Sequence, residues 1–239
     1  MSFRPVLTLV LSALCVFHAQ AEVYFREQSV NFKKVLPPPP EDSSPAGLAD
    51  LDTVLQVQAS RTEAQIEQAK EVDRQSPFSF GRPIFGKWFT SENLPKTKEI
   101  FERIGRQTEP ICDAAKANWN RERPYVRDTR VQPIVGKPHN TSYPSGHSFG
   151  AAMWGIVLAA AFPEHAEQLK QRVHDAMWGR VIGGAHYPTD TQAGLLLAEA
   201  VGKELLKSPD TKRALKIMRE EIEAVGAQHA DQDSDESSN

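Results

Sequence analysis

Cysteine is nearly absent from this chain, and so are long apolar runs, strand-like alternation and a basic surplus. The chain has two cysteines in 239 residues, Cys15 and Cys112, and only Cys112 lies outside the N-terminal apolar segment, so a disulfide framework is excluded. No apolar run reaches the roughly 20 residues that a spanning helix needs. A net charge of −3 offers no basic surface to nucleic acid. The composition is that of an ordinary globular protein, with 40% hydrophobic and 25% charged residues.

The first 21 residues predict a secretory signal peptide. Arg4 gives a positive start, residues 6–17 form a short apolar run, and Ala19-Gln20-Ala21 fits cleavage before Glu22. The alternative is a membrane anchor, but the run is too short to span a bilayer. We therefore expect a periplasmic or secreted protein with no stable membrane insertion after cleavage.

The rest of the chain has helical rather than strand periodicity. Residues 22–47 are expected to form a proline-rich extension, with Pro37–Pro40 extended over the body. Residues 48–226 are expected to form one domain, and residues 227–239 a disordered acidic tail. The predicted fold class is all-α, a single-domain helical bundle. Helices are expected over 51–57, 64–69, 100–104, 111–119 with a stop at Pro124, 148–162, 166–180, from about 188, and 209–226, with a loop over 78–89.

Three segments carry groups that bind phosphate or move protons. A phosphoryl group in transfer needs several cationic donors, a nucleophile in line with the leaving group, and an acid for the departing oxygen. Together the segments can supply all of these parts. They are Lys116 with Arg123-Pro124, Pro144-Ser145-Gly146-His147, and Arg180 with His186 and Asp190.

The order and spacing of these segments resemble the signature of the phosphatidic acid phosphatase type 2 and vanadium haloperoxidase superfamily. Residues 142–147, and Leu36 followed by four prolines, resemble the class A bacterial non-specific acid phosphatases. The resemblance runs from about Leu36 to the C-terminal helix and implies a metal-independent acid phosphatase, a phosphoric monoester hydrolase that works through a phosphohistidine. Gly179 departs from the pattern because the family usually has serine there, and Thr141 and Ser148 replace the usual glycine and threonine.

The residues also predict the catalytic role of each histidine. His186 is the expected nucleophile because Asp190, four residues later, can orient its ring, and His147 is the expected general acid and base. The resemblance implies the same roles. No cofactor is expected, and no cluster of residues resembles a metal site. The expected phosphate-binding residues are Lys116, Arg123, Ser145, Gly146 and Arg180.

Two other functions stay open. A vanadium-dependent haloperoxidase would use a similar pocket to hold vanadate, and a non-catalytic phosphate-binding module would need the cations without a nucleophile and an acid. The expected partners are small phosphorylated substrates, with no nucleic acid and a possible homo-oligomer, and the natural substrate stays undetermined. The cleft walls are expected to include Trp88, Phe89 and Tyr125, and Cys112 is expected to be a buried, inert thiol.

Overall fold

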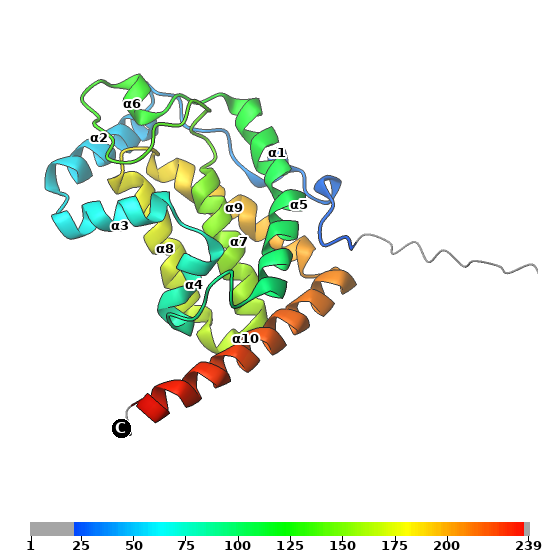
Figure 1. The fold of residues 1–239 in the computed structure, drawn as a ribbon. Helices are drawn as coiled ribbons and strands as arrows, with labels where there is room; N and C mark the ends of the chain where they lie inside the picture. Colours follow the sequence, from blue (N-terminus) through cyan, green and yellow to red (C-terminus); the bar gives the residue numbers. More distant parts are fainter. Residues whose placement is uncertain (1–21, 237–239) are drawn as a thin grey trace, which may run out of the picture.

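The protein is helical throughout the part that the structure, a computed structural model, describes: residues 22–236, with side chains through residue 230. Every regular element in that range is a helix (Figure 1), which confirms the all-α bundle with its N-terminal extension. Two short 3₁₀ turns, η1 (Glu27–Ser29) and η2 (Pro163–His165), accompany the α-helices. These are α1 (Phe32–Val35), α2 (Pro45–Ser60), α3 (Glu63–Asp73), α4 (Pro77–Phe85), α5 (Pro95–Trp119), α6 (Pro124–Arg127), α7 (Gly146–Ala161), α8 (Ala166–Ile182), α9 (Pro188–Leu205) and α10 (Pro209–Glu236).

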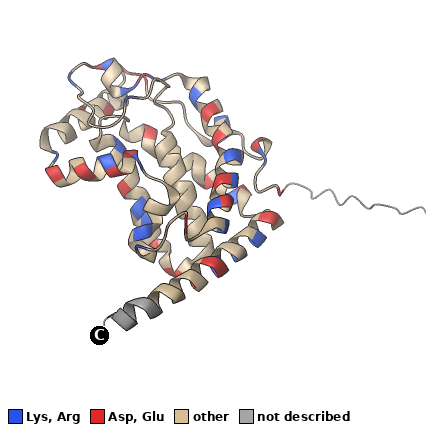
Figure 2. Cartoon of the chain, viewed as in Figure 1, with Lys and Arg blue, Asp and Glu red and all other residues tan. Residues whose placement is uncertain are grey.

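Helix α7 forms the centre of the bundle. It contains no Lys, Arg, Asp or Glu (Figure 2), and its buried residues lie on several faces. Helices α8 and α9 pack against it most extensively, and α4, α5 and α10 cover the remaining sides. Small residues permit this close packing, since a Cβ added at Gly155 would stand only 2.7 Å from Val173 of α8, and one at Gly202 of α9 only 2.9 Å from Ile156.

The segment before α2 lies along the outside of the bundle and is tied to it by buried side chains and hydrogen bonds. Tyr24 and Phe25 are buried, and their N–H groups donate to the Gln107 side chain of α5 at 2.8 and 3.0 Å. The N–H of Val23 donates to Asp210 at the start of α10 at 2.8 Å. The N-terminal arm, residues 22–44, is therefore fixed both to α5 and to the start of α10.

The loop predicted over residues 78–89 is wrong, because α4 occupies most of it. The Ser76 side chain caps this helix and Pro77 is its first residue, a position at which proline favours a helix start. Phe78 and Phe80 then enter the core. The glycine and prolines suggested a loop, but burial of the aromatic side chains outweighs their poor helix propensity.

Helix α5 ends before Pro124 rather than at it. It is one continuous helix across Pro110, and it stops where Asn120 adopts a left-handed conformation with φ 48°. The N–H of Asn120 closes the last turn on the carbonyl of Lys116. Asparagine is one of the few residues that take this conformation readily at a helix end.

Helix α10 continues past Gly226, where the sequence predicted its end. The tail expected to be disordered from residue 227 is therefore helical in its backbone through Glu236. A Cβ at Gly226 would stand 2.9 Å from the Trp88 ring, and the His229 ring stacks on the same indole with centroids 6.1 Å apart. The glycine provides a close contact with Trp88 instead of a helix stop.

Within residues 22–236, no helix combines the length and the apolar character that crossing a bilayer requires. The predicted signal peptide, residues 1–21, lies outside the described residues.

Candidate active site

The three segments meet at one place in the bundle. The first comes from the end of α5 and the turn after it, the second from the start of α7, and the third from the end of α8 and the turn into α9. Arg123 and His186, 63 residues apart, approach to 3.1 Å, and the Lys116 ammonium lies 2.5 Å from the carbonyl of Pro144. All eight predicted site residues are therefore neighbours.

His186 is buried, with 1% of its surface exposed. Its Nε2 lies 3.1 Å from the Arg123 guanidinium, and its Nδ1 lies 3.4 Å from the Asp190 carboxylate. Arginine only donates and a carboxylate only accepts, so the neutral ring carries its proton on Nδ1 and a lone pair on Nε2. Burial, followed by the charges of Arg123 and Arg180, holds the pKa of His186 well below its usual value. The ring is thus neutral, with its lone pair on Nε2.

Asp190 is held by a network that the sequence did not reveal. Its two oxygens accept hydrogen bonds from the Ser142 hydroxyl at 2.5 Å, the Tyr187 N–H at 2.9 Å and the Arg121 guanidinium at 2.7 Å. Arg121 also pairs with Asp50 of α2 at 2.8 Å and stacks on the Tyr187 ring at 4.1 Å. This network fixes the carboxylate that faces the His186 ring. The available signals were the position of Arg121 inside the first segment and that of Ser142 in the motif over residues 142–147, whereas Asp50 lies far upstream with no motif around it.

Lys116 and Arg123 hold the backbone that surrounds the site. The buried ammonium of Lys116 donates to the carbonyls of Thr141 at 3.0 Å and Pro144 at 2.5 Å, and burial lowers the pKa of Lys116 to about 8. Arg123 donates to the backbone and side-chain oxygens of Asn140 at 2.8 and 2.6 Å, and to the Ala185 carbonyl at 2.9 Å. Both cations therefore orient the loop that leads into α7.

Among residues 22–230, Arg180 has two buried donors without a partner, whereas Arg121 has one, its Nε. The Arg180 side chain is fully buried, and its Nη1 donates to Asp73 at 2.5 Å. Its Nε and Nη2 have no hydrogen-bond partner among the described residues. Leaving a buried donor unpaired costs about 1–3 kcal/mol, and more for a charged group. An oxyanion that reaches these two nitrogens would satisfy both, since a guanidinium presents a fork suited to phosphate.

His147 lies at the open side of the site, with 39% of its side chain exposed. Its Nε2 lies 3.3 Å from the carbonyl of Asp73 and 3.9 Å from the carboxylate of the same residue. Partial burial and the charge of Arg180 lower the pKa of His147 to about 4. Burial would raise the pKa of Asp73, but hydrogen bonds from Arg180 and Gly136 outweigh it and lower that pKa. Asp73, the last residue of α3, therefore touches both His147 and Arg180, and no local sequence signal identified it.

Ser145 and Gly146 form the N-terminal end of α7. The Ser145 hydroxyl accepts the N–H of Ser148 at 3.3 Å and caps the helix, and its own N–H donates to the Asp190 carbonyl at 2.9 Å. A Cβ at Gly146 would lie 3.7 Å from the Lys116 side chain. The glycine thus keeps the space between the helix terminus and the lysine open. The phosphate contact expected of Ser145 stays a prediction.

Of the three aromatic residues expected to wall the cleft, one lies at the site. The Tyr125 hydroxyl donates to the Pro138 carbonyl at 2.7 Å, and the ring is close enough for the charges of Arg123 and Arg180 to oppose the rise in its pKa that burial causes. Trp88 instead packs on α10, and Phe89 is fully buried in the core.

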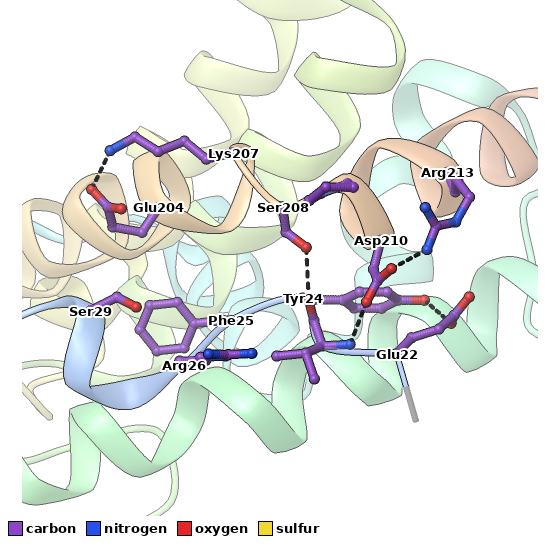
Figure 3. Close-up of a pocket in the computed structure, with 12 residues that line it drawn as sticks. Glu22, Tyr24, Phe25, Arg26, Ser29, Glu204, Lys207, Ser208, Asp210 and Arg213 are labelled. Atoms are coloured by element: carbon purple, nitrogen blue, oxygen red, sulfur yellow. Dashed lines mark hydrogen bonds and ion pairs between the residues drawn. The ribbon is translucent and has the colours of Figure 1, made fainter. Parts of the chain in front are cut away.

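A hollow of ≈ 600 Å³ lies elsewhere, between the N-terminal arm and the junction of α9 and α10 (Figure 3). Most of its charged groups are already paired, Lys207 with Glu204, Arg213 with Asp210 and Glu22 with Arg103. No residue of the three segments lines it. Among the described residues, no group of three or more His, Cys, Asp or Glu side chains could hold a metal ion.

Solved structures with this fold include a membrane phosphatase and a peroxidase. The crystal structure of a transmembrane PAP2-type phosphatidylglycerolphosphate phosphatase from Bacillus subtilis has a TM-score of 0.52 and 19% identity, and covers 70% of this chain and 87% of that one. A bacterial vanadium-dependent iodoperoxidase has a TM-score of 0.56 and 19% identity, and covers 75% of this chain and 53% of its own. At this identity the likeness concerns the fold alone.

Acid phosphatases are among the proteins whose sequences are similar to this chain. A non-specific acid phosphatase of Salmonella typhi is 30% identical over 207 residues, which are 82% of each chain. An acid phosphatase of Zymomonas mobilis is 30% identical over 197 residues, 79% of this chain and 74% of that one. These relatives support phosphatase activity. The profile of the PAP2 superfamily matches residues 108–214, which contain all three segments. The chain belongs to the PAP2 superfamily, as its three segments predicted.

Proposed function

We propose that this protein is an exported, metal-independent acid phosphatase that hydrolyses small phosphomonoesters through a phosphohistidine on His186. The observation that carries the proposal is the buried Arg180, whose Nε and Nη2 donors are unpaired beside a neutral histidine with its Nε2 lone pair free of a proton. The names of the acid phosphatase relatives support the same reaction class.

In the first step, the Nε2 of His186 attacks phosphorus and the bond from phosphorus to the alcohol oxygen breaks. His147, in its imidazolium form, gives its proton to that oxygen. The cations Lys116, Arg123 and Arg180 stabilise the charge on the equatorial oxygens. Asp190 stabilises the ring as it becomes positively charged, because it accepts from Nδ1.

In the second step, neutral His147 takes a proton from a water molecule, and the oxygen of that water attacks the phosphohistidine. The bond between Nε2 and phosphorus breaks, inorganic phosphate leaves, and His186 returns to its neutral form. His147 is protonated again and ready for the next ester, so the two steps close a cycle.

The two histidines are distinguished by the intermediate that each variant accumulates. His186→Ala should form no phosphoenzyme with any ester, because it lacks the accepting nitrogen. His147→Ala should still be phosphorylated by nitrophenyl phosphate, whose leaving group needs little protonation, but should turn over slowly for want of a base. Rapid quench with labelled substrate should trap an acid-labile, base-stable phosphoramidate in the wild type and in His147→Ala. A phosphoenzyme in a folded His186→Ala protein would overturn these roles.

Export is proposed from the apolar run over residues 6–17 and the Ala19-Gln20-Ala21 sequence that follows it. Expression of the full chain in a Gram-negative host, followed by fractionation, should place the enzyme in the periplasm. N-terminal sequencing should then begin at Glu22. A cytoplasmic protein that begins at residue 1 or 2 would contradict the export proposal without affecting the phosphatase proposal.

A further inference from the structure

A cleft of ≈ 330 Å³ lies between α5 and α7, beside the proposed general acid. Gly146 and His147 form part of its lining, whereas Arg123, Arg180 and His186 do not line it. A general acid must come within hydrogen-bond reach of the oxygen that it protonates. The alcohol half of a bound ester therefore has to extend from the phosphate pocket past His147, and this cleft is the space that the structure provides there.

The walls of the cleft are mainly apolar. The hydroxyl of Thr108, which also faces it, is engaged with the carbonyl of Ile104 at 2.9 Å, and the Cys112 thiol is buried. An apolar or planar aromatic group gains from burial against these walls, and the polar side chains of the cleft are those of Gln75, Glu109 and Asp113. The apolar and aromatic wall residues are Phe101 and Ile104 from α5, and Phe149, Met153 and Trp154 from α7.

Two glycines keep the cleft open. A Cβ at Gly150 of α7 would project to 3.8 Å from the Trp154 ring, and one at Gly105 of α5 would stand 3.1 Å from the Glu109 carboxylate. Both glycines line the cleft. Glycine weakens a helix interior, and at these two positions its small size leaves the space between α5 and α7 unfilled.

Apart from His147, the ionisable side chains at the mouth of the cleft are carboxylates. Glu109 and Asp113 are exposed, lie one turn apart on α5 and both line the cleft. Neither forms an ion pair with another residue in the described part of the chain, and no lysine or arginine is among the lining residues. Two uncompensated carboxylates repel an approaching anion, and such repulsion contributes to selectivity between ligands of equal size.

We propose that this cleft is the leaving-group subsite of the enzyme. It accepts phosphomonoesters of uncharged or cationic aromatic and apolar alcohols, and it disfavours alcohols that carry a carboxylate or a further phosphate. The inference rests on the proposed function, because it assigns the alcohol half of the same substrate. Glu109 and Asp113 are the residues that determine the charge preference.

A matched pair of substrates tests the charge preference. At pH 6, 3-carbamoylphenyl phosphate and 3-carboxyphenyl phosphate differ mainly in one negative charge. The wild type should show a kcat/KM about three- to tenfold higher for the amide, as expected of two exposed charges. The double variant Glu109→Gln/Asp113→Asn should bring the ratio near one, while Glu99→Gln, on the same helix but outside the cleft, should leave it unchanged. Equal rates in the wild type, or a preference that survives in the double variant, would overturn the proposal.

A second variant tests the apolar walls. Gly150→Leu should fill the cleft, weaken the binding of phenylphosphonate by about tenfold or more, and leave the affinity for inorganic phosphate within about twofold, both measured by calorimetry. The unchanged phosphate affinity would also show that the variant is folded. Equal losses for both ligands would contradict the assignment. If the wild type binds phosphate but hydrolyses no ester, the proposed phosphatase function is wrong. If it hydrolyses esters without selectivity among their alcohols, only the leaving-group subsite is wrong.

Discussion

Two histidines at one site differ in chemistry because their surroundings differ. The His186 ring is enclosed between the Arg123 guanidinium and the Asp190 carboxylate, which fixes its neutral tautomer. The His147 ring is partly exposed and faces Asp73. Sequence spacing alone assigned a carboxylate partner only to His186. Asp73 is a second carboxylate at the site, and it contacts both His147 and Arg180.

Replacement of Asp73 by asparagine should shift the pH dependence of activity. The carboxylate raises the pKa of His147, so its loss should lower that pKa further. Because His147 acts as an acid in its protonated form, kcat/KM falls as pH rises through this pKa, and the fall should move to lower pH by up to about one unit. Phosphate should bind about two- to tenfold more tightly, because Arg180 loses a competing anion.

Both effects are measurable from pH profiles of kcat/KM and from the inhibition constant of inorganic phosphate. Asp128→Asn, which removes a surface partner of Arg130, is the matched control and should change neither. A shift of the profile to higher pH would contradict the argument.

All eight predicted site residues meet in the structure, because their spacing in the chain reflects the helix ends and turns that present them. The supporting residues missed are Asp50, Asp73 and Arg121, and Ser142 lay within the motif over residues 142–147 without a role assigned to it. They act through contacts between elements that are far apart in sequence. No periodicity or motif reports such a contact, so single-sequence reasoning recovers the groups that converge at the site and misses the residues that hold them in place.

At the scale of elements, the sequence predicted which helices exist better than where they end. Proline and glycine were taken as breaks at 78–89 and at Gly226, yet Pro77 starts a helix and Gly226 lets α10 pack on Trp88. These residues favour a break only when nothing is gained by burial. Long-range packing, which local propensity does not contain, decided both cases.

Gly179 shows how one close contact between elements shapes the site. A Cβ at this position of α8 would lie 3.0 to 3.3 Å from three atoms of Val72 on α3. Gly179→Ser should therefore lower the free energy of unfolding by about 1–2 kcal/mol. It should also move the neighbouring Asp73 relative to Arg180, with a change in kcat/KM of less than about tenfold.

A double-mutant cycle in denaturant tests the cause. Val72→Ala makes room for the serine hydroxymethyl group, so the double variant should be more stable than the two single losses would give if they were additive. Strict additivity would show that the contact with Val72 is not the source of the loss, and a large gain in activity would mean that the serine supplies a missing contact with the substrate.

At the scale of the whole molecule, the two histidines of the site should make stability depend on pH. Both His186, which is buried, and His147, which is partly buried, lie near cationic side chains. Their pKa values lie below the ordinary value of 6.5, to about 4 for His147 and well below 6.5 for His186. The unfolded chain therefore binds more protons than the folded one in this range. Folding should become less favourable as the pH falls.

The melting temperature of the unliganded protein should accordingly fall as pH decreases from about 6.5 to about 4, since stability is retained above the unfolded pKa and lost towards the folded one. His147→Gln should make this dependence shallower. Inorganic phosphate should restore stability at the acid end, because it binds only the folded state. Calorimetry across this pH range would contradict the expectation if the slope were absent in the wild type or unchanged in the variant.

The buried thiol at the cleft has a practical consequence. Cys112 is the one cysteine within residues 22–236 and is 4% exposed, and burial raises its pKa to about 11. Only the thiolate reacts rapidly with alkylating reagents, so Cys112 should not react with them near neutral pH. In a protein that begins at Glu22, a cysteine introduced at an exposed position such as Glu220 of α10 would then be the sole reactive thiol. That protein could carry a fluorophore, or be immobilised in a chosen orientation, without removal of any native side chain from its core.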